Sequence, residues 1–152
     1  MANMTAEKMY KTVIAALDER EWKYEREDEK LRVTYKVGGD DLPMHFIMWV
    51  DEEHELVCLV SPMLVNFPED KRVEGAIATC YVTNTLANGC FEYDLSDGQT
   101  VFRMANTYAG SDITTKVIHY MFSVAAKTVD DCNDKFFMLA KGMLSIDDFI
   151  GQ

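Results

Sequence analysis

Residues 91–98, with the sequence FEYDLSDG, form the densest group of side chains in the chain that could do chemistry. Their carboxylates are the groups that bind Ca²⁺ or act as acid–base pairs in hydrolases. A calcium loop needs oxygen ligands at its first, third and fifth positions and a glycine at the sixth. Counted from Asp94, Gly98 stands fifth, and counted from Glu92 the sixth residue is Asp97. We therefore expect no calcium site here.

Alternation explains the same residues as part of a β-hairpin. Successive side chains of a strand point to opposite faces, and here apolar residues alternate with acids. Phe91, Tyr93 and Leu95 would then share the apolar face, and the acids would face solvent. The sequence SDG at 96–98 would reverse the chain, because Gly98 can adopt a positive φ angle. The segment predicts a strand and a turn without a catalytic pair.

The three histidines and four cysteines show no catalytic or metal-binding spacing. There is no HxxH, HExxH or CxxC pattern for zinc, and no GxSxG or GxGxxG turn for a nucleophile or a cofactor. Cys58 and His45 could meet across adjacent strands as a nucleophile and its base. His119 lies in an apolar stretch, which is typical of a core or interface histidine with one hydrogen-bond partner. We expect no catalytic residue, no metal and no cofactor.

The cysteines are interpreted as reduced thiols that pack in the core of a cytosolic protein, since free cysteine is among the most buried residue types. They are Cys58, Cys80, Cys90 and Cys132.

Charge and composition limit the classes of partner. The net charge is −11, from 26 acidic and 15 basic residues, which disfavours binding to nucleic acid. No run of 18 apolar residues predicts a membrane span, and the first residues do not resemble a signal peptide. We expect a cytoplasmic protein of one domain, residues 1–152.

Hydrophobic periodicity predicts the elements that position these residues. A helix is expected over residues 5–20, with Thr5 as its N-cap. A short edge strand follows, on which Trp22 and Tyr24 would both face the core. Three more strands joined by short loops make an antiparallel meander, and the middle strand is the most apolar. These strands are expected over 31–37, 44–50 and 56–60.

A second long helix is expected in the C-terminal part of the chain. It would open at Ser111 or Asp112 and end before Gly142, and residues 130–134 could divide it in two. A short last helix would follow Ser145 as its N-cap. The apolar stripe of the long helix is predicted to hold Ile113, Val117, Met121, Val124, Thr128, Cys132 and Phe136.

These elements give an α+β fold in the order α-β-β-β-α-β-β-α. Its antiparallel sheet has about five to six strands, and the helices pack on the sheet.

Residues 75–91 contain no charged side chain. Pro68, the acids that follow it and Gly89 predict a helix between them. A helix that is neutral all round is usually buried on more than one side, so one side should lie on the sheet and the other on a second subunit. The candidate residues of this dimer or partner interface are Ile77, Cys80, Tyr81 and Asn84.

The element order and four motifs resemble the YbjN family of bacterial proteins, also described as sensory-transduction regulators. The motifs are PEDKR at 68–72, NTLANG at 84–89, FEYDLSDGQTVFR at 91–103 and KGMLSIDDFI at 141–150. The resemblance covers nearly the whole chain. It implies a fold like that of type III secretion chaperones, usually assembled as a homodimer, and it brings no catalytic residues.

Two functions remain open at this point. The first is a non-enzymatic cytosolic interaction module, chaperone-like or regulatory, that binds an unidentified protein partner as a homodimer. The partner would use an apolar groove or a free sheet edge. The alternative is a small-ligand-binding or enzymatic domain, with a pocket between sheet and helices that uses Cys58, His45 or the acidic hairpin. A deep pocket with two titratable groups of shifted pKa would favour this alternative.

Overall fold

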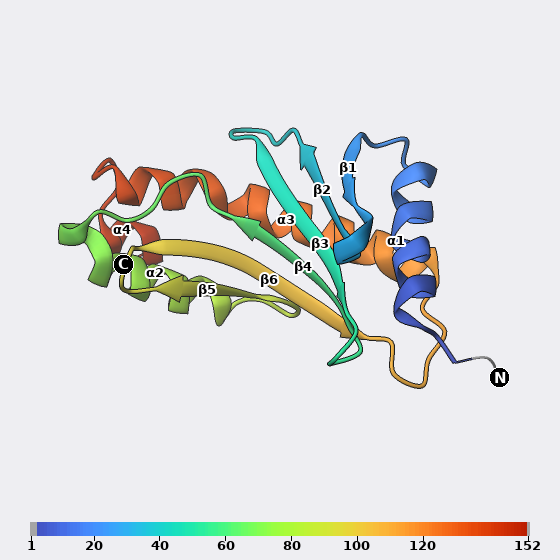
Figure 1. The fold of residues 1–152 in the computed structure, drawn as a ribbon. Coiled ribbons are helices and arrows are strands. Elements are labelled where there is room, and N and C mark those ends of the chain that lie inside the picture. Colours follow the sequence, from blue (N-terminus) through green and yellow to red (C-terminus); the bar gives the residue numbers. More distant parts are fainter. Residues whose placement is uncertain (1–2, 152) are drawn as a thin grey trace.

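The computed structural model describes residues 3–151, which fold around one six-stranded antiparallel sheet (Figure 1). The strands lie in the order β1-β2-β3-β4-β6-β5, so that β1 and β5 form the two edges. The class and the strand number agree with the sequence prediction. The strands are β1 (Tyr24–Glu27), β2 (Arg32–Val37), β3 (Met44–Asp51), β4 (Leu56–Pro62), β5 (Cys90–Asp94) and β6 (Gln99–Thr107).

The helices gather on one side of the sheet. In Figure 1, α3 runs behind the strands, with α1 near one of its ends and α2 and α4 near the other. None of these helices crosses the front face, so within residues 3–151 only one face of the sheet is covered. The helices are α1 (Ala6–Glu19), α2 (Arg72–Thr83), α3 (Thr115–Ala140) and α4 (Ile146–Ile150), with 3₁₀ turns η1 (Asp28–Lys30) and η2 (Glu69–Lys71).

The core lies between the covered face and the helices. Strand β3 shows how it forms, because its residues alternate strictly between buried and half-buried. Met44, Phe46, Met48 and Val50 point inward and are at most 5% exposed. The predicted meander of β2, β3 and β4 is confirmed by their antiparallel register.

The N-terminal helix agrees with its prediction. Thr5 caps α1, and its hydroxyl accepts a hydrogen bond from the Lys8 N–H. Trp22, in contrast, precedes the edge strand and does not lie on it. Its half-buried ring packs against the core, with its centroid 5.4 Å from that of Tyr35 and 5.3 Å from that of Phe122. The placement on β1 was wrong because Glu21 has a φ of 56° and turns the chain between α1 and β1.

Helix α3 is continuous over 26 residues, so the predicted break at 130–134 is wrong, as is the predicted start at Ser111 or Asp112. Two of the acids there have polar partners. Asp130 accepts a hydrogen bond from the Asp40 N–H at 2.9 Å, and Asp131 pairs with Lys127 one turn earlier in the same helix. The buried face is also rotated by about one residue from the predicted stripe. It holds Ile118, Met121, Phe122, Ala125, Val129, Asn133, Phe136, Leu139 and Ala140.

Helix α2 ends at Thr83, earlier than Gly89 predicted. The Thr83 hydroxyl accepts a hydrogen bond from the Phe91 N–H at 2.9 Å, which ties the end of the helix to the start of β5. Gly89 has a φ of 80°, and a Cβ atom there would lie 2.6 Å from the Phe102 ring. The glycine therefore serves the turn into β5 and does not end the helix.

The β5–β6 hairpin is confirmed. Gly98 has a φ of 75°, donates its N–H to the Asp94 carbonyl and accepts a hydrogen bond from the Phe67 N–H at 2.9 Å. Ser96 donates its N–H and its hydroxyl to the Asp94 carboxylate. The placement of Leu95 on the apolar face was wrong, because β5 stops at Asp94 and Leu95 lies 62% exposed in the turn.

Candidate interaction surfaces

The outer face of α2 is an exposed stripe without charge. Val73, Ile77 and Tyr81 are 71%, 46% and 45% exposed, and Cys80 and Asn84 are exposed beside them. Residues four apart on a helix lie on the same face, so these side chains share one surface. The structure thus places the four predicted interface residues together. Within this chain, α2 is buried on one side only.

The inner face of α2 packs closely because its residues are small. A Cβ atom on Gly75 would lie 2.5 Å from the Tyr93 hydroxyl and 2.6 Å from the Phe67 ring. The Tyr93 hydroxyl donates to the Arg72 carbonyl, and Thr79 donates to the Gly75 carbonyl. The Thr79 bond lies within α2, whereas the Tyr93 bond and the close approach at Gly75 fix the helix on the sheet and hold its outer stripe in place.

A second apolar surface lies on the uncovered face of the sheet. We call it the open face. In the strand register Trp49 lies opposite Cys58, and Ile47 lies opposite Val60. Cys58 and Val60 are buried between their neighbours, while Ile47 and Trp49 are half-buried. The apolar centre of the open face is formed by Ile47, Trp49, Cys58, Val60, Val101 and Ala105.

One arginine lies within this apolar centre. The Arg103 guanidinium lies over the Trp49 ring, 5.8 Å from its centroid, and its Nε lies 2.8 Å from Glu92 Oε1. The cation is therefore neutralised by a carboxylate and stacked on an aromatic face. Arg103 leaves no unpaired positive charge for an acidic partner.

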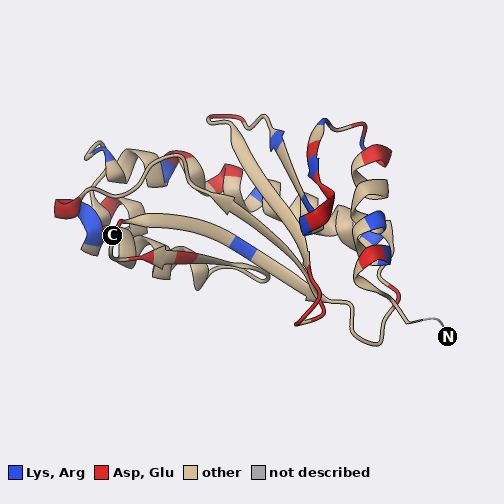
Figure 2. Ribbon diagram, in the orientation of Figure 1, with Lys and Arg blue, Asp and Glu red and all other residues tan. Residues whose placement is uncertain are grey.

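Acidic residues surround the open face. Figure 2 shows red segments in the β3–β4 turn and along β1 and β5, whereas β4 and all of β3 except its last residue are free of charge. The basic residues on this face are few: Arg32, whose Nε donates to Glu27 at 2.8 Å, Lys36 and the paired Arg103. The acidic rim consists of Glu25, Glu27, Asp51, Glu52, Glu53, Glu55, Glu92 and Asp94.

Sequence reasoning missed the open face. It did note that the β3 segment is strongly apolar, and it took this as a sign of burial. The usable signal was that β4 is apolar on both faces and that β3 carries Ile47 and Trp49 on its outward side, a pattern typical of strands covered on both sides.

The cysteines do not behave as one group. Cys80 is exposed, so its interpretation as a core residue was wrong: it lies on the outer side of α2, away from the sheet. Cys58 is buried, and Cys90 and Cys132 are partly buried. Burial raises the pKa of Cys58 and of Cys90, and raises that of Cys132 to about 11. These three thiols are therefore protonated at neutral pH, which does not suit a nucleophile.

The structure does not bring Cys58 and His45 together. The cross-strand neighbour of Cys58 is Trp49, and His45 lies four residues further along β3, about 13 Å away. His119 has two partners where one was predicted. Its Nδ1 accepts from Arg20 Nε at 3.0 Å, and its Nε2 lies 2.6 Å from Glu19 Oε2. This histidine joins α1 to α3.

Residues 3–151 contain no group of three or more His, Cys, Asp and Glu side chains placed to hold a metal ion. In the same part of the chain, none of the helices has both the length and the apolarity needed to cross a bilayer.

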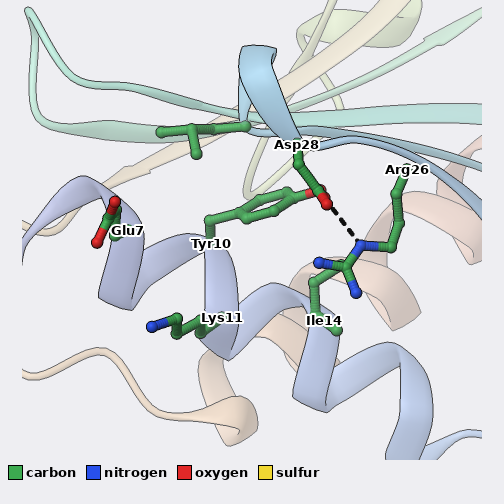
Figure 3. A pocket seen from close by; sticks show the side chains of 7 residues that line it. Glu7, Tyr10, Lys11, Ile14, Arg26 and Asp28 are labelled. Atoms are coloured by element: carbon green, nitrogen blue, oxygen red, sulfur yellow. Dashed lines mark hydrogen bonds and ion pairs between the residues drawn. The ribbon is translucent and has the colours of Figure 1, made fainter.

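An open pocket of about 380 Å³ lies between α1 and the β1–η1 segment (Figure 3). Tyr10 and Arg26 both point at Asp28: the Tyr10 hydroxyl donates to Asp28 Oδ1 at 2.7 Å and Arg26 Nε donates to it at 2.8 Å. The hydrogen bond from Arg26 lowers the pKa of Asp28, and burial raises the pKa of Tyr10. Both shifts move the pKa away from neutrality, so neither group is tuned for acid–base chemistry.

No family model matches the sequence, and no curated protein matches it. Two solved structures resemble the fold. A chain of the crystal structure of the ExsC–ExsE complex has a TM-score of 0.56 and 12% identity, over 86% of this chain and 97% of that one. A chain of the HopA1–SchA chaperone–effector complex has a TM-score of 0.49 and 11% identity, over 79% of this chain and 89% of that one. The chain has an α+β fold of the secretion-chaperone type.

Proposed function

We propose that the chain is a single-domain, non-enzymatic module that binds a protein partner in the cytoplasm as a homodimer, with a chaperone-like or regulatory role. The observation that carries the proposal is the charge-free outer stripe of α2, exposed although apolar. The fold gives further support, because the similar structure with the higher TM-score is a complex of two proteins. The resemblance of the sequence motifs leads us to propose membership of the YbjN family as well.

The dimer interface is proposed on α2, at Ile77, Cys80, Tyr81 and Asn84. In a two-fold dimer the same surface of both subunits meets, so a charged surface would face its own charge. The α2 stripe avoids this cost because it has no charged side chain. Helix α2 also lies beside β5, the edge strand of the sheet, so the interface can extend onto that edge.

Sedimentation at micromolar concentration tests the dimer with a matched pair of variants. The wild type is expected to be a dimer and Ile77→Glu a folded monomer, because an unpaired charge buried in an interface is costly. Ile47→Glu places the same charge on the open face and should stay dimeric. A monomeric wild type would overturn the homodimer, and circular dichroism of each variant checks that it folds.

Affinity purification from the native host, read by mass spectrometry, tests protein binding. A single protein recovered specifically with the wild type is expected. An unrelated acidic protein of similar size, carrying the same tag, is the control. Recovery of no protein would favour the small-ligand alternative, although Asp28 in the pocket beside α1 is already engaged by Tyr10 and Arg26.

A further inference from the structure

The open face has the composition of a covered surface. Strands that are apolar on both sides normally lie between two layers. Strand β4 is of this kind, and the outward side of β3 holds Ile47 and Trp49 between His45 and Asp51. In residues 3–151 the helices supply one layer only. A bound segment that supplied a second layer would remove the half-buried Ile47, Trp49 and Val101 further from water.

We infer that the open face binds an amphipathic segment of a partner protein, apolar on one side and rich in Lys and Arg on the other. This inference rests on the proposed protein-binding function and gives the chemistry of the segment bound. Its apolar side covers Ile47, Trp49 and Val101, and its basic residues meet the acidic rim.

Charge decides which occupant fits. The rim carries eight carboxylates, of which Glu27 and Glu92 are ion-paired with Arg32 and Arg103, so six carboxylates and one further base, Lys36, remain on this face. A second copy would bring an identical acidic rim against this one, and like charges at an interface are destabilising. A basic segment gains attraction from the same carboxylates. The open face is thus unsuited to self-association.

The size of the apolar centre fits one helix. Neighbouring strands are about 4.8 Å apart, so the side chains of β3 and β6, with β4 between them, span about 10 Å. This is the diameter of an α-helix with its side chains. A single helix laid on the open face reaches Glu92 on one side and the β3–β4 turn at residues 52–55 at one end.

The test uses a labelled synthetic peptide of 18 residues with leucine on one helical face and lysine on the other, measured by fluorescence anisotropy. Two matched controls are a peptide with glutamate in place of lysine and one with the leucine and lysine positions scrambled. The protein variants Ile47→Lys and Val101→Lys put a cation in the apolar centre. Met143→Lys puts one on an exposed apolar residue between α3 and α4, on the helical side.

We expect the lysine peptide to bind and both control peptides to bind at least about tenfold more weakly. Ile47→Lys and Val101→Lys should each weaken binding by about tenfold or more, and Met143→Lys by less than about twofold. Undiminished binding to both open-face variants, or equal binding of the glutamate peptide, would overturn the inference. So would a change of Ile47→Lys from dimer to monomer, which would make the open face a contact between copies.

A further variant tests the acidic rim without changing the apolar centre, so its result does not depend on whether Ile47→Lys and Val101→Lys fold. The triple change Glu52→Gln, Glu53→Gln and Glu55→Gln alters only exposed residues of the β3–β4 turn and leaves the apolar centre intact. It should weaken peptide binding by about fivefold at low salt and reduce its salt dependence. Unchanged affinity and unchanged salt dependence would contradict the role of the rim. These outcomes are independent of the dimer and partner-capture experiments, so the inference can fail while the proposed function stands.

Discussion

The outer face of α2 and the open face of the sheet are both apolar, yet they differ in exposure and in what surrounds them. Ile77 and Tyr81 are exposed, whereas Ile47 and Trp49 are only half-buried and Val60 is buried. Apart from Val73, which lies between Arg72 and Glu74, the α2 stripe lies in the charge-free residues 75–91, whereas the open face is bordered by eight carboxylates. An apolar patch shows that a surface favours a partner. The charges around it decide whether that partner can be a copy of the same chain.

The largest effect is expected from an acid on the α2 stripe. Tyr81→Asp should raise the dimer dissociation constant at least about 100-fold, since an unpaired charge buried at the interface costs about 3 kcal/mol or more. Thr34→Asp, on the open face beside Ile47, should change it by less than about twofold. Sedimentation equilibrium across a range of concentrations measures both. Equal effects of the two acids would remove the distinction between the surfaces.

The α2 stripe carries Cys80 and the apolar centre of the open face carries Cys58, and these two thiols should respond differently to dissociation of the dimer. Cys80 should react with a thiol reagent at least about tenfold more slowly in the dimer than in the monomeric Ile77→Glu variant. Cys58 is buried and its pKa is raised by burial, so it should react slowly in both states. Its rate should grow only as the pH rises above the usual range of a thiol.

Mass spectrometry of the labelled peptides identifies which cysteine has reacted. Cys80→Ser is the control that assigns the fast phase. A fast Cys80 in the wild type at a concentration where sedimentation shows a dimer would place the interface elsewhere.

A smaller effect is expected from salt. Raising the salt concentration from about 0.05 M to about 0.5 M should weaken the binding of the lysine peptide by about tenfold, because the attraction between exposed charges is screened. The dissociation constant of the dimer should change by less than about twofold over the same range of salt. Titrations of both equilibria in the same buffers measure the difference. A dimer as sensitive to salt as the peptide would show that charge contributes to both contacts.

The smallest effect is expected from neutralising the rim in the absence of any peptide. The triple variant Glu52→Gln, Glu53→Gln and Glu55→Gln loses part of the repulsion that keeps two open faces apart. It should show weak association beyond the dimer at high protein concentration, detected as a rise in the average mass by light scattering. An average mass identical to that of the wild type at every concentration would indicate that the remaining carboxylates are enough to keep two open faces apart.

Much of the fold could be predicted because it depends on local periodicity. The helix after Thr5, the meander and the Gly98 turn are each specified by residues close together in the sequence. The continuity of α3 could not be predicted in this way. Its acids at 130–134 resemble a loop until Asp130 meets the Asp40 N–H, which is 90 residues away in the sequence.

The two surfaces also differ in whether they could be predicted from residues close together in the sequence. The α2 residues could be grouped from sequence because the helical period puts Ile77 and Tyr81 on one side. The open face could not be recognised, because apolar residues on both faces of β3 predict burial without saying what covers them. Only the placement of all the helices on one side showed that the cover is missing.

The position of α2 has a consequence for avidity. Helix α3 is about 39 Å long, and α2 lies at the end opposite to α1 (Figure 1). A dimer through α2 would therefore carry two open faces, on the order of 40 Å apart. A partner with two basic segments would need a linker of at least about a dozen residues to reach both. Once the first segment is bound, the second binds at a high effective concentration, so two weak contacts can hold one chain tightly.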